Sequence, residues 1–257
     1  MDDLIRLSID RREVSDLFQA SSSITTETRR LLGGFGHVYS WTGFGDPTFA
    51  ARLAEVSGAS PNLYPFRGLR PHEHASDYYA RCIGALATAP IDRIIAIDRS
   101  WVNEFVAGHG LDAAPWLILH PGSGSARKNW LGFGDLIRAW RAQSNWRTVT
   151  LVGPAENDVK LGADISIANI SLPRVAALLS ASSGYVGNDS GISHLAGAVG
   201  ASGVVLFGSS DPITWAPRGG RLSILQAPAI CDRCGSDRFC AHRLTVESVL
   251  RTLSKHT

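Results

Sequence analysis

The sequence predicts an α/β fold in which parallel strands are covered by helices on both faces. From Pro115 onward, apolar runs such as WLILH and TVTLVG alternate with segments of helical periodicity such as FGDLIRAWRAQ and LPRVAALLSA. Strands that alternate with helices of this length form parallel sheets wound on both faces. Ligands on such sheets bind beyond the carboxyl ends of the strands, and the Gly, Ser, Asp and Lys residues of this chain lie at those ends.

Composition and charge exclude several classes of protein. The 257 residues are 44% hydrophobic and carry a formal net charge of +2, with Lys and Arg scattered along the chain. This distribution argues against a nucleic-acid partner. The N-terminal MDDLIRLSID has acidic residues where a signal peptide has basic ones, and no apolar run has the length of a membrane span. We therefore expect a cytoplasmic protein with at most peripheral contact to the inner face of a membrane.

The two halves of the chain differ in how regularly predicted strands and helices alternate, and we expect two domains, 1–112 and 113–257. The first half contains a strand candidate, HVYSW, a turn, TGFGDP, and helix candidates from Thr48 to Val56 and over 72–87. The segment around Pro90 to Asp98 resembles an extended linker. The regular alternation of strands and helices begins only in the second half.

The loop HPGSGSARKNW, residues 120–130, follows a predicted strand and precedes a helix. Gly122 and Gly124 let backbone N–H groups approach an anion, and Ser123 and Ser125 add hydroxyl donors. Lys128 would place a full positive charge on a diphosphate. The alternative is a flexible connection with a solvated lysine.

A second loop, GNDSGISHLAGAVG, opens a helix at another strand end. Asp189 or Ser190 is a natural N-cap, and the N–H groups of Ser190, Gly191 and Ile192 would lie at the positive end of the helix dipole. A phosphate fits there. The alternative is a well-capped helix with His194 packed beneath the sheet. Two helix starts suited to anions in one sheet favour the phosphate site.

Two further loops could line the same cleft. In LVGPAEND, Glu156 follows a strand and could accept hydrogen bonds from ribose hydroxyls, although a lone carboxylate is more often a solvated surface group. LFGSSDPITWAPRG closes a strand with small residues and a proline turn, and a plain loop is an equal alternative.

The segment CDRCGSDRFCAH contains a cysteine cluster. Cys231, Cys234, Cys240 and His242 have the ligand count of a structural tetrahedral site for zinc or iron. The spacing of the last two ligands is unusual, so reduced cysteines without metal are the alternative. A metal held here would be structural.

In this order, HPGSGSARKNW, GNDSGISHLAGAVG and LFGSSDP resemble glycosyltransferase family 9, which contains the lipopolysaccharide heptosyltransferases. The resemblance extends through the cysteine cluster to LTVESVL and so covers the second half of the chain. Upstream, HVYSWTGFGDPTF and HEHASDYYARCIGAL are similar to parts of the family's first half. The resemblance implies a GT-B fold, in which two Rossmann-like domains face a cleft and the C-terminal one binds the donor.

The resemblance also implies roles for individual residues and a reaction. Glu156 would contact the ribose and Ile170 the base. The residues implied at the diphosphate and sugar are Ser123, Gly124, Ser125, Lys128, Asp189, Ser190, Gly191, Ile192 and His194. Family members invert the anomeric centre without a divalent metal, with an ADP-sugar such as ADP-heptose as donor and a lipopolysaccharide-type glycan or glycolipid as acceptor.

The front of the chain departs from the family pattern. Nothing in residues 1–35 matches the strand and Gly-Asp turn that carry the family's base, so the N-terminal Rossmann-like domain is expected to be incomplete. Asp46 in GFGDP mimics that turn and is the candidate base, although its surroundings align better with a later strand. An incomplete sheet would expose an edge, which favours a homodimer or poor solubility.

Two rival functions follow from these patterns. The first is a nucleotide-sugar-binding protein that has lost catalysis, which the missing base favours. The second is a cofactor-dependent oxidoreductase. The oxidoreductase hypothesis is disfavoured because Arg127 occupies the position where a GxGxxG fingerprint has its third glycine.

Overall fold

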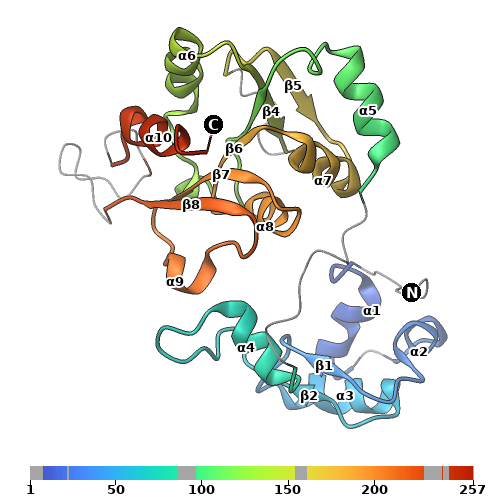
Figure 1. Cartoon of the computed structure of the whole chain (residues 1–257). Helices are drawn as coiled ribbons and strands as arrows, with labels where there is room; N and C mark the ends of the chain where they lie inside the picture. The colour runs from blue at the N-terminus through green and yellow to red at the C-terminus, as the bar shows by residue number, and fades with distance from the viewer. Residues whose placement is uncertain are drawn as a thin grey trace. The chain divides into compact units, whose positions relative to one another are not determined.

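The structure is a computed structural model that describes residues 8–21, 23–85, 97–153, 161–228, 239 and 243–256 (Figure 1). The chain forms two compact units, Met1–Ala87 and Thr88–Thr257. Each unit has its own core and is described by itself.

In the second unit, the described residues form a six-stranded sheet in the order β5-β4-β3-β6-β7-β8, with every neighbouring pair parallel. The strands are β3 Trp116–His120, β4 Arg147–Val152, β5 Ile165–Ala168, β6 Gly184–Asn188, β7 Ser202–Phe207 and β8 Arg221–Gln226. The chain runs outward from β3 to β5 and then returns to place β6 against β3. The prediction of an α/β fold with a parallel sheet is confirmed, and the strand order reverses between β3 and β6.

Helices cover both faces of this sheet (Figure 1). They are α5 Arg99–Gly108, α6 Phe133–Gln143, α7 Leu172–Ala181, α8 Gly191–Ala198, α9 Pro212–Trp215 and α10 Val246–Leu253. Residues of α6 and α10 share one buried cluster with Leu117 and Leu119. Residues of α5, α7 and α8 share the other with Ile118. Successive β3 side chains therefore point to opposite helical layers, which explains why the whole strand is buried.

The helix α6 shows how the sequence specifies these elements. Its buried residues are Phe133, Leu136, Ile137 and Trp140, at positions i, i+3, i+4 and i+7 along one face. This spacing forms an apolar stripe on a 3.6-residue helix. The stripe packs against the sheet, and the predicted helix FGDLIRAWRAQ matches the observed bounds.

The first unit is smaller and mostly helical. Its elements are α1 Arg12–Ser15, a 3-10 turn Asp16–Phe18, α2 Thr26–Leu32, β1 Tyr39–Ser40, α3 Pro47–Ser57, β2 Asn62–Leu63 and α4 Ala75–Cys82. The short strands β1 and β2 pair in parallel. Leu17, Phe49, Leu53 and Val56 form the core of this unit, so α3 contributes most of its apolar contacts.

Several elements differ from the sequence-based expectations. The strand expected over HVYSW is reduced to Tyr39–Ser40, and the helix expected over 72–87 spans Ala75–Cys82. The helix α5 and the edge strands β5 and β8 were not predicted. Most of the expected linker falls in 86–96, outside the described residues. The helix α5 packs on α7 and so belongs to the second unit.

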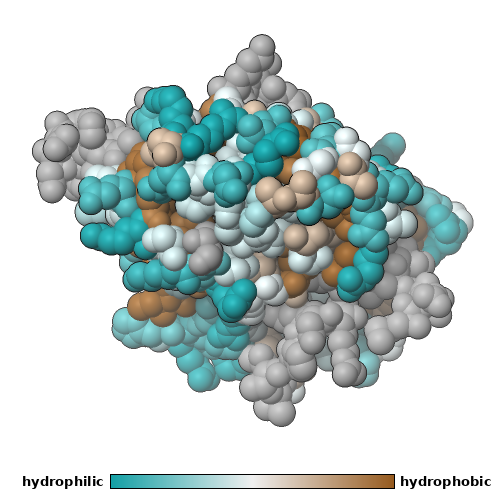
Figure 2. Space-filling model, turned by 45° about the horizontal axis from the view of Figure 1, so that its top comes forward, coloured by the Kyte–Doolittle hydropathy of each residue, from teal (hydrophilic) through white to brown (hydrophobic). Residues whose placement is uncertain are grey.

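The surface is mixed in polarity. Figure 2 shows a face on which hydrophilic and intermediate residues surround smaller hydrophobic areas. Within the described ranges, no helix is long and apolar enough to cross a membrane.

Candidate functional site

Two loops meet where the strand order reverses, at the carboxyl ends of β3 and β6. His120 at the end of β3 lies opposite Gly187 of β6 in the sheet register. Asn188 ties the loops together: its Nδ2 donates to the Pro121 carbonyl at 2.6 Å, and its Oδ1 accepts from the Trp130 N–H at 3.1 Å. The Asn188 side chain is buried, so these bonds fix the first loop on the second. Asn188 belongs to the motif GNDSG, but the sequence alone indicates no role for it.

An ion pair links the same two loops. Lys128 Nζ donates to Asp189 Oδ2 at 2.6 Å, and Ser210 Oγ donates to the same oxygen at 2.5 Å. The Asp189 side chain is 6% exposed and that of Lys128 34%. The carboxylate is therefore held inside the protein by two donors, while the lysine reaches it from the surface. Two residues predicted separately from two motifs are in direct contact.

The predicted serines of the first loop shape the loop itself. Ser123 Oγ lies 2.6 Å from Asn129 Oδ1 and accepts the Ser125 N–H at 3.2 Å. The Ser125 side chain caps the 3-10 turn Ala126–Lys128 by accepting the Arg127 N–H. These bonds hold Lys128 at the end of a defined turn. Contact of either hydroxyl with a diphosphate remains a prediction.

The second loop delivers the N-terminus of α8 to the site. Ser190 is the N-cap and accepts the Ser193 N–H at 3.3 Å, which confirms it as one of the two predicted caps. Ser193 Oγ in turn lies 2.8 Å from Tyr185 Oη, and burial raises the pKa of that phenol, so it stays protonated. The N–H groups at the start of a helix lack intrahelical acceptors and attract anions. His194 is exposed on α8, so the alternative that packs it beneath the sheet is wrong.

One glycine in each of the two loops has open space where a side chain would lie. A Cβ added to Gly124 or Gly191 would meet no atom within 4 Å, and neither residue has a positive φ. Internal packing and backbone conformation therefore do not require glycine at either position. The missing side chains instead leave both backbones accessible to a ligand.

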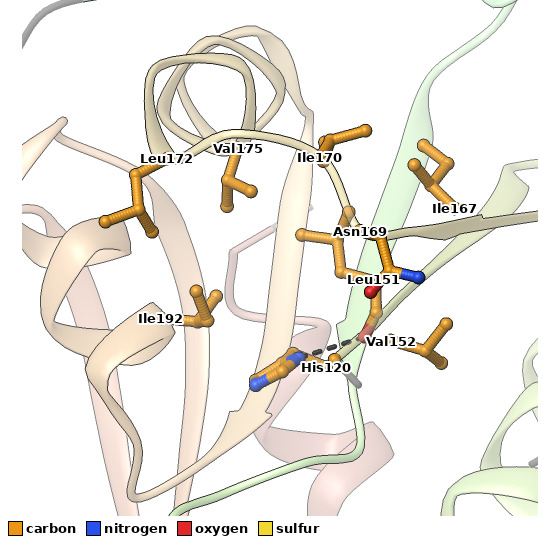
Figure 3. A pocket seen from close by; sticks show the side chains of 10 residues that line it. His120, Leu151, Val152, Ile167, Asn169, Ile170, Leu172, Val175 and Ile192 are labelled. Atoms are coloured by element: carbon orange, nitrogen blue, oxygen red, sulfur yellow. Dashed lines mark hydrogen bonds between the residues drawn. The ribbon is translucent and has the colours of Figure 1, made fainter. Parts of the chain in front are cut away.

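An apolar pocket of about 390 Å³ opens beside the polar loops (Figure 3). Its lining residues come from the ends of β3, β4 and β5 and the starts of α7 and α8: His120, Leu151, Val152, Gly153, Ile167, Asn169, Ile170, Leu172, Val175 and Ile192. Of these, Ile170 and Ile192 were predicted as donor-binding residues. Ile192 belongs to the first turn of α8, so one helix start borders both the pocket and the polar loops.

Two polar residues interrupt the apolar lining. His120 Nδ1 donates to the Leu151 carbonyl at 2.9 Å, a bond drawn in Figure 3, and this fixes the proton on Nδ1 in the neutral ring. Asn169 has a positive φ of 56°, a conformation that asparagine tolerates better than most residues. Neither residue was singled out from the sequence. The pocket therefore combines broad apolar walls with a few hydrogen-bonding groups, as small-molecule sites do.

The sequence profile described as "Glycosyltransferase family 9 (heptosyltransferase)" matches residues 102–239, more than half of the chain. The chain belongs to glycosyltransferase family 9. No curated protein matches the sequence closely. The matched range contains both polar loops and the apolar pocket, and the predicted family is confirmed.

Solved structures of family 9 proteins share this fold. The glycosyl transferase family 9 from Veillonella parvula DSM 2008 superposes with a TM-score of 0.70 at 18% identity, over 95% of this chain and 78% of that one. E. coli heptosyltransferase WaaC with ADP gives 0.62 at 18% identity, over 96% and 79%. E. coli ADP-heptose lps heptosyltransferase II gives 0.63 at 15% identity, over 95% and 81%. The α/β fold with parallel sheets thus resembles that of heptosyltransferases.

The remaining predicted residues of this family 9 chain are Glu156, the four candidate metal ligands and Asp46. Glu156 and the four candidate metal ligands, Cys231, Cys234, Cys240 and His242, fall outside the described residues. In the described ranges, no group of three or more His, Cys, Asp or Glu could hold a metal ion. Asp46, in the first unit, is the N-cap of α3, where its Oδ1 accepts the Phe49 N–H at 3.0 Å.

Proposed function

We propose that this family 9 glycosyltransferase transfers a sugar, heptose or a close analogue, from an ADP-sugar to a lipopolysaccharide-type glycan, with inversion and without a metal. The observation that carries the proposal is the Lys128–Asp189 contact. It joins two loops suited to a diphosphate at the point where the strand order reverses. Ligands of open α/β sheets bind at such points.

The apolar pocket would hold the nucleotide base. Its volume of about 390 Å³ falls in the range of small-molecule sites, and Ile170 and Ile192 offer apolar contact to the face of a purine ring. Asn169 can donate and accept hydrogen bonds, as the edge of adenine requires. The structure of E. coli heptosyltransferase WaaC with ADP supports adenine as the base. Glu156, which follows β4 in the sequence, would meet the ribose.

The diphosphate would lie between the first turn of α8 and Lys128. The lysine ammonium has three N–H donors, so it can keep Asp189 and still bind a phosphate oxygen. When the acceptor hydroxyl displaces the diphosphate, negative charge grows on the leaving oxygen. Preorganised donors stabilise that charge most strongly, and Lys128 with the N–H groups of Gly191 and Ile192 would supply them. Ser123, Ser125, Ser190 and His194 would complete the contacts of the diphosphate and sugar.

Two candidate functions differ in whether this chain supplies a base that accepts the proton of the acceptor hydroxyl. Asp46 is the candidate base, and its Oδ1 already caps α3. That cap favours the second candidate, a nucleotide-sugar-binding protein without transfer activity, because it gives the carboxylate a structural role of its own. General-base assistance contributes about 10²–10⁴-fold to rate, so the two candidates differ measurably.

One experiment tests both candidates. Purified protein is titrated with ADP, UDP and NAD in a calorimeter and then assayed with ADP-heptose and a heptose-accepting lipopolysaccharide core. ADP should bind more tightly than UDP or NAD, and sugar should be transferred. Asp46→Asn keeps a good N-cap but removes the base. Loss of transfer with unchanged ADP affinity would assign catalysis to Asp46. ADP binding without transfer in the parent chain would favour the binding protein, and no preference for ADP would overturn the donor assignment.

A further inference from the structure

A third loop reaches the Lys128–Asp189 ion pair. It follows β7 and belongs to the motif LFGSSDP, which from the sequence alone fits a plain loop as well as a part of the cleft. Ser210 of this loop donates its Oγ proton to Asp189 Oδ2 at 2.5 Å, the oxygen that also accepts from Lys128 Nζ at 2.6 Å. The proposed transfer reaction assigns a role to the lysine and none to this serine.

Backbone contacts fix the base of this third loop. The Asp189 N–H donates to the Leu206 carbonyl at 3.0 Å, so the loop after β6 lies beside the end of β7. Arg243, which is buried, donates from Nη2 to the Gly208 carbonyl at 3.2 Å. Ser210 therefore follows two residues after an anchored point of the chain, and this anchor holds its hydroxyl within reach of Asp189.

The two adjacent serines of this loop have different surroundings. Ser210 is half-buried and bonded to Asp189. Ser209 is exposed, and among the residues that the structure describes its hydroxyl forms no hydrogen bond. The loop thus presents one hydroxyl to the ion pair and one to solvent, which gives the chain a control of the same chemistry one residue away.

Burial makes the Asp189 carboxylate depend on its donors. Its side chain is 6% exposed, whereas that of Lys128 is 34% exposed and so has more freedom to move. Within the described ranges, the carboxylate accepts from Lys128 and Ser210 and from no other group. A buried charge that loses its partner is strongly unfavourable. Movement of the lysine ammonium toward a phosphate is therefore opposed unless another donor stays on Asp189.

We propose that Ser210 is a positioning residue, which keeps a donor on Asp189 while Lys128 engages the diphosphate of the nucleotide-sugar. As the ammonium turns N–H donors toward a phosphate oxygen, its contact with Asp189 weakens. The Ser210 hydroxyl stays on Oδ2 and lowers the free-energy cost of that rearrangement. A hydroxyl suits this role because it stabilises the carboxylate and leaves its charge to attract the lysine. The inference rests on the proposed function, since it concerns the same diphosphate site.

The test measures the Kd of ADP by calorimetry for the full chain and three variants of this loop, each first shown to be folded by its denaturant midpoint. Ser210→Ala removes the hydroxyl, so ADP should bind about tenfold more weakly. Ser210→Thr keeps a hydroxyl at the same position and should restore most of the affinity. Ser209→Ala is the matched control, because it removes the neighbouring hydroxyl that is exposed to solvent, and its Kd should equal that of the parent chain.

A second background separates positioning from a general loss of structure. Asp189→Asn removes the charge that Ser210 stabilises, so adding Ser210→Ala to it should cost little further ADP affinity. An equal loss in both backgrounds would mean that Ser210 acts without Asp189, and this would overturn the proposal. A parent-like Kd in Ser210→Ala would overturn the positioning role and leave the donor assignment intact. Absence of ADP binding in the parent chain would overturn both, so the two failures are distinguishable.

Discussion

Lys128 Nζ lies 2.6 Å from Asp189 Oδ2, and this ion pair joins the loop after β3 to the loop after β6. It differs from the exposed pairs of the chain because the Asp189 side chain is almost fully buried. Exposed ion pairs contribute little to the free energy of unfolding, whereas breaking a buried pair leaves a buried charge without an opposite charge beside it. The pair therefore has a structural role as well as its proposed role toward the donor, and experiments must separate the two.

Replacing the lysine should weaken the donor nucleotide. Lys128→Met removes the charge that would meet the diphosphate, and charge-assisted contacts contribute about 1.5–3 kcal/mol. We expect the Kd of ADP to rise roughly 10-fold to 150-fold at neutral pH, measured by calorimetry on the folded variant. A Kd unchanged from that of the parent chain would remove Lys128 from the donor site.

A double variant separates the two roles of the pair. Lys128→Met alone leaves the buried Asp189 carboxylate with the Ser210 hydroxyl as a donor but without a positive charge beside it, so the free energy of unfolding should fall by about 1–3 kcal/mol. Lys128→Met combined with Asp189→Asn removes the uncompensated charge and should recover most of that stability. The ADP affinity should stay low. If the double variant recovered ADP affinity together with stability, Lys128 would support ADP binding only by stabilising the folded loops and not by contacting ADP.

The apolar pocket gives an independent prediction for the base. Ile192→Ala removes apolar contact from the wall of the pocket, and ADP should lose about 1–2 kcal/mol of binding free energy. The calorimetric preference for ADP over UDP should shrink with it. Ile213→Ala is the control, since Ile213 is an isoleucine, 53% exposed, that does not line the pocket. Equal losses in the two variants would argue against the pocket as the base site.

The parts of the fold that the sequence predicts well are those with strong local signals. The helices α6 and α7 and the strands β3 and β4 were expected at or close to their observed bounds. Each has a clear apolar period or a fully apolar run next to a glycine or polar turn. The edge strand β5 was missed because Ile165–Ala168 alternates between half-buried and exposed residues over a length too short to stand out.

The candidate site was predicted from the sequence only in part. The polar loops were predicted because glycine, serine and lysine cluster in contiguous motifs. The apolar pocket was not predicted, because its walls come from four separate segments of the chain that only the sheet order brings together. Asn188 also escaped notice. Its function is to bond two backbone groups, Pro121 O and Trp130 N–H, that are distant in sequence, and a single sequence contains no record of such contacts.

The surroundings of His256 predict a pH dependence of the free energy of unfolding. His256 Nδ1 lies 3.1 Å from Ser202 Oγ and its Nε2 2.8 Å from Ser223 Oγ. Burial, with added repulsion from Arg221 and Lys255, lowers the pKa of His256 below its usual 6.5. The folded state therefore disfavours the charged ring. Stability should be unaffected by this group above pH 6.5 and should fall as the pH drops from 6.5 through the lowered pKa.

The measurement compares denaturant midpoints of the parent chain and His256→Gln at pH 7.5 and pH 5.5. Other titrating groups act equally in both proteins, so the difference between them isolates His256. The parent chain should lose more stability than the variant on acidification. A parallel decline in both would show that the histidine does not contribute.

The two open glycines give the sharpest separation of binding from folding. Gly124→Ala and Gly191→Ala each add a methyl group to space that holds no protein atom, so the free energy of unfolding should stay the same or rise slightly. If the diphosphate approaches these backbones, the same methyl groups should obstruct it and raise the Kd of ADP about tenfold, roughly 1.4 kcal/mol. Gly108→Ala is the matched control, because Gly108 ends α5 with equally open space but stands outside both loops. The expected pattern is therefore three variants with parent-like unfolding midpoints, of which the two in the loops bind ADP weakly. Parent-like affinity in all three would place the diphosphate away from these loops, whereas lower stability in the loop variants would show that glycine is needed there for folding.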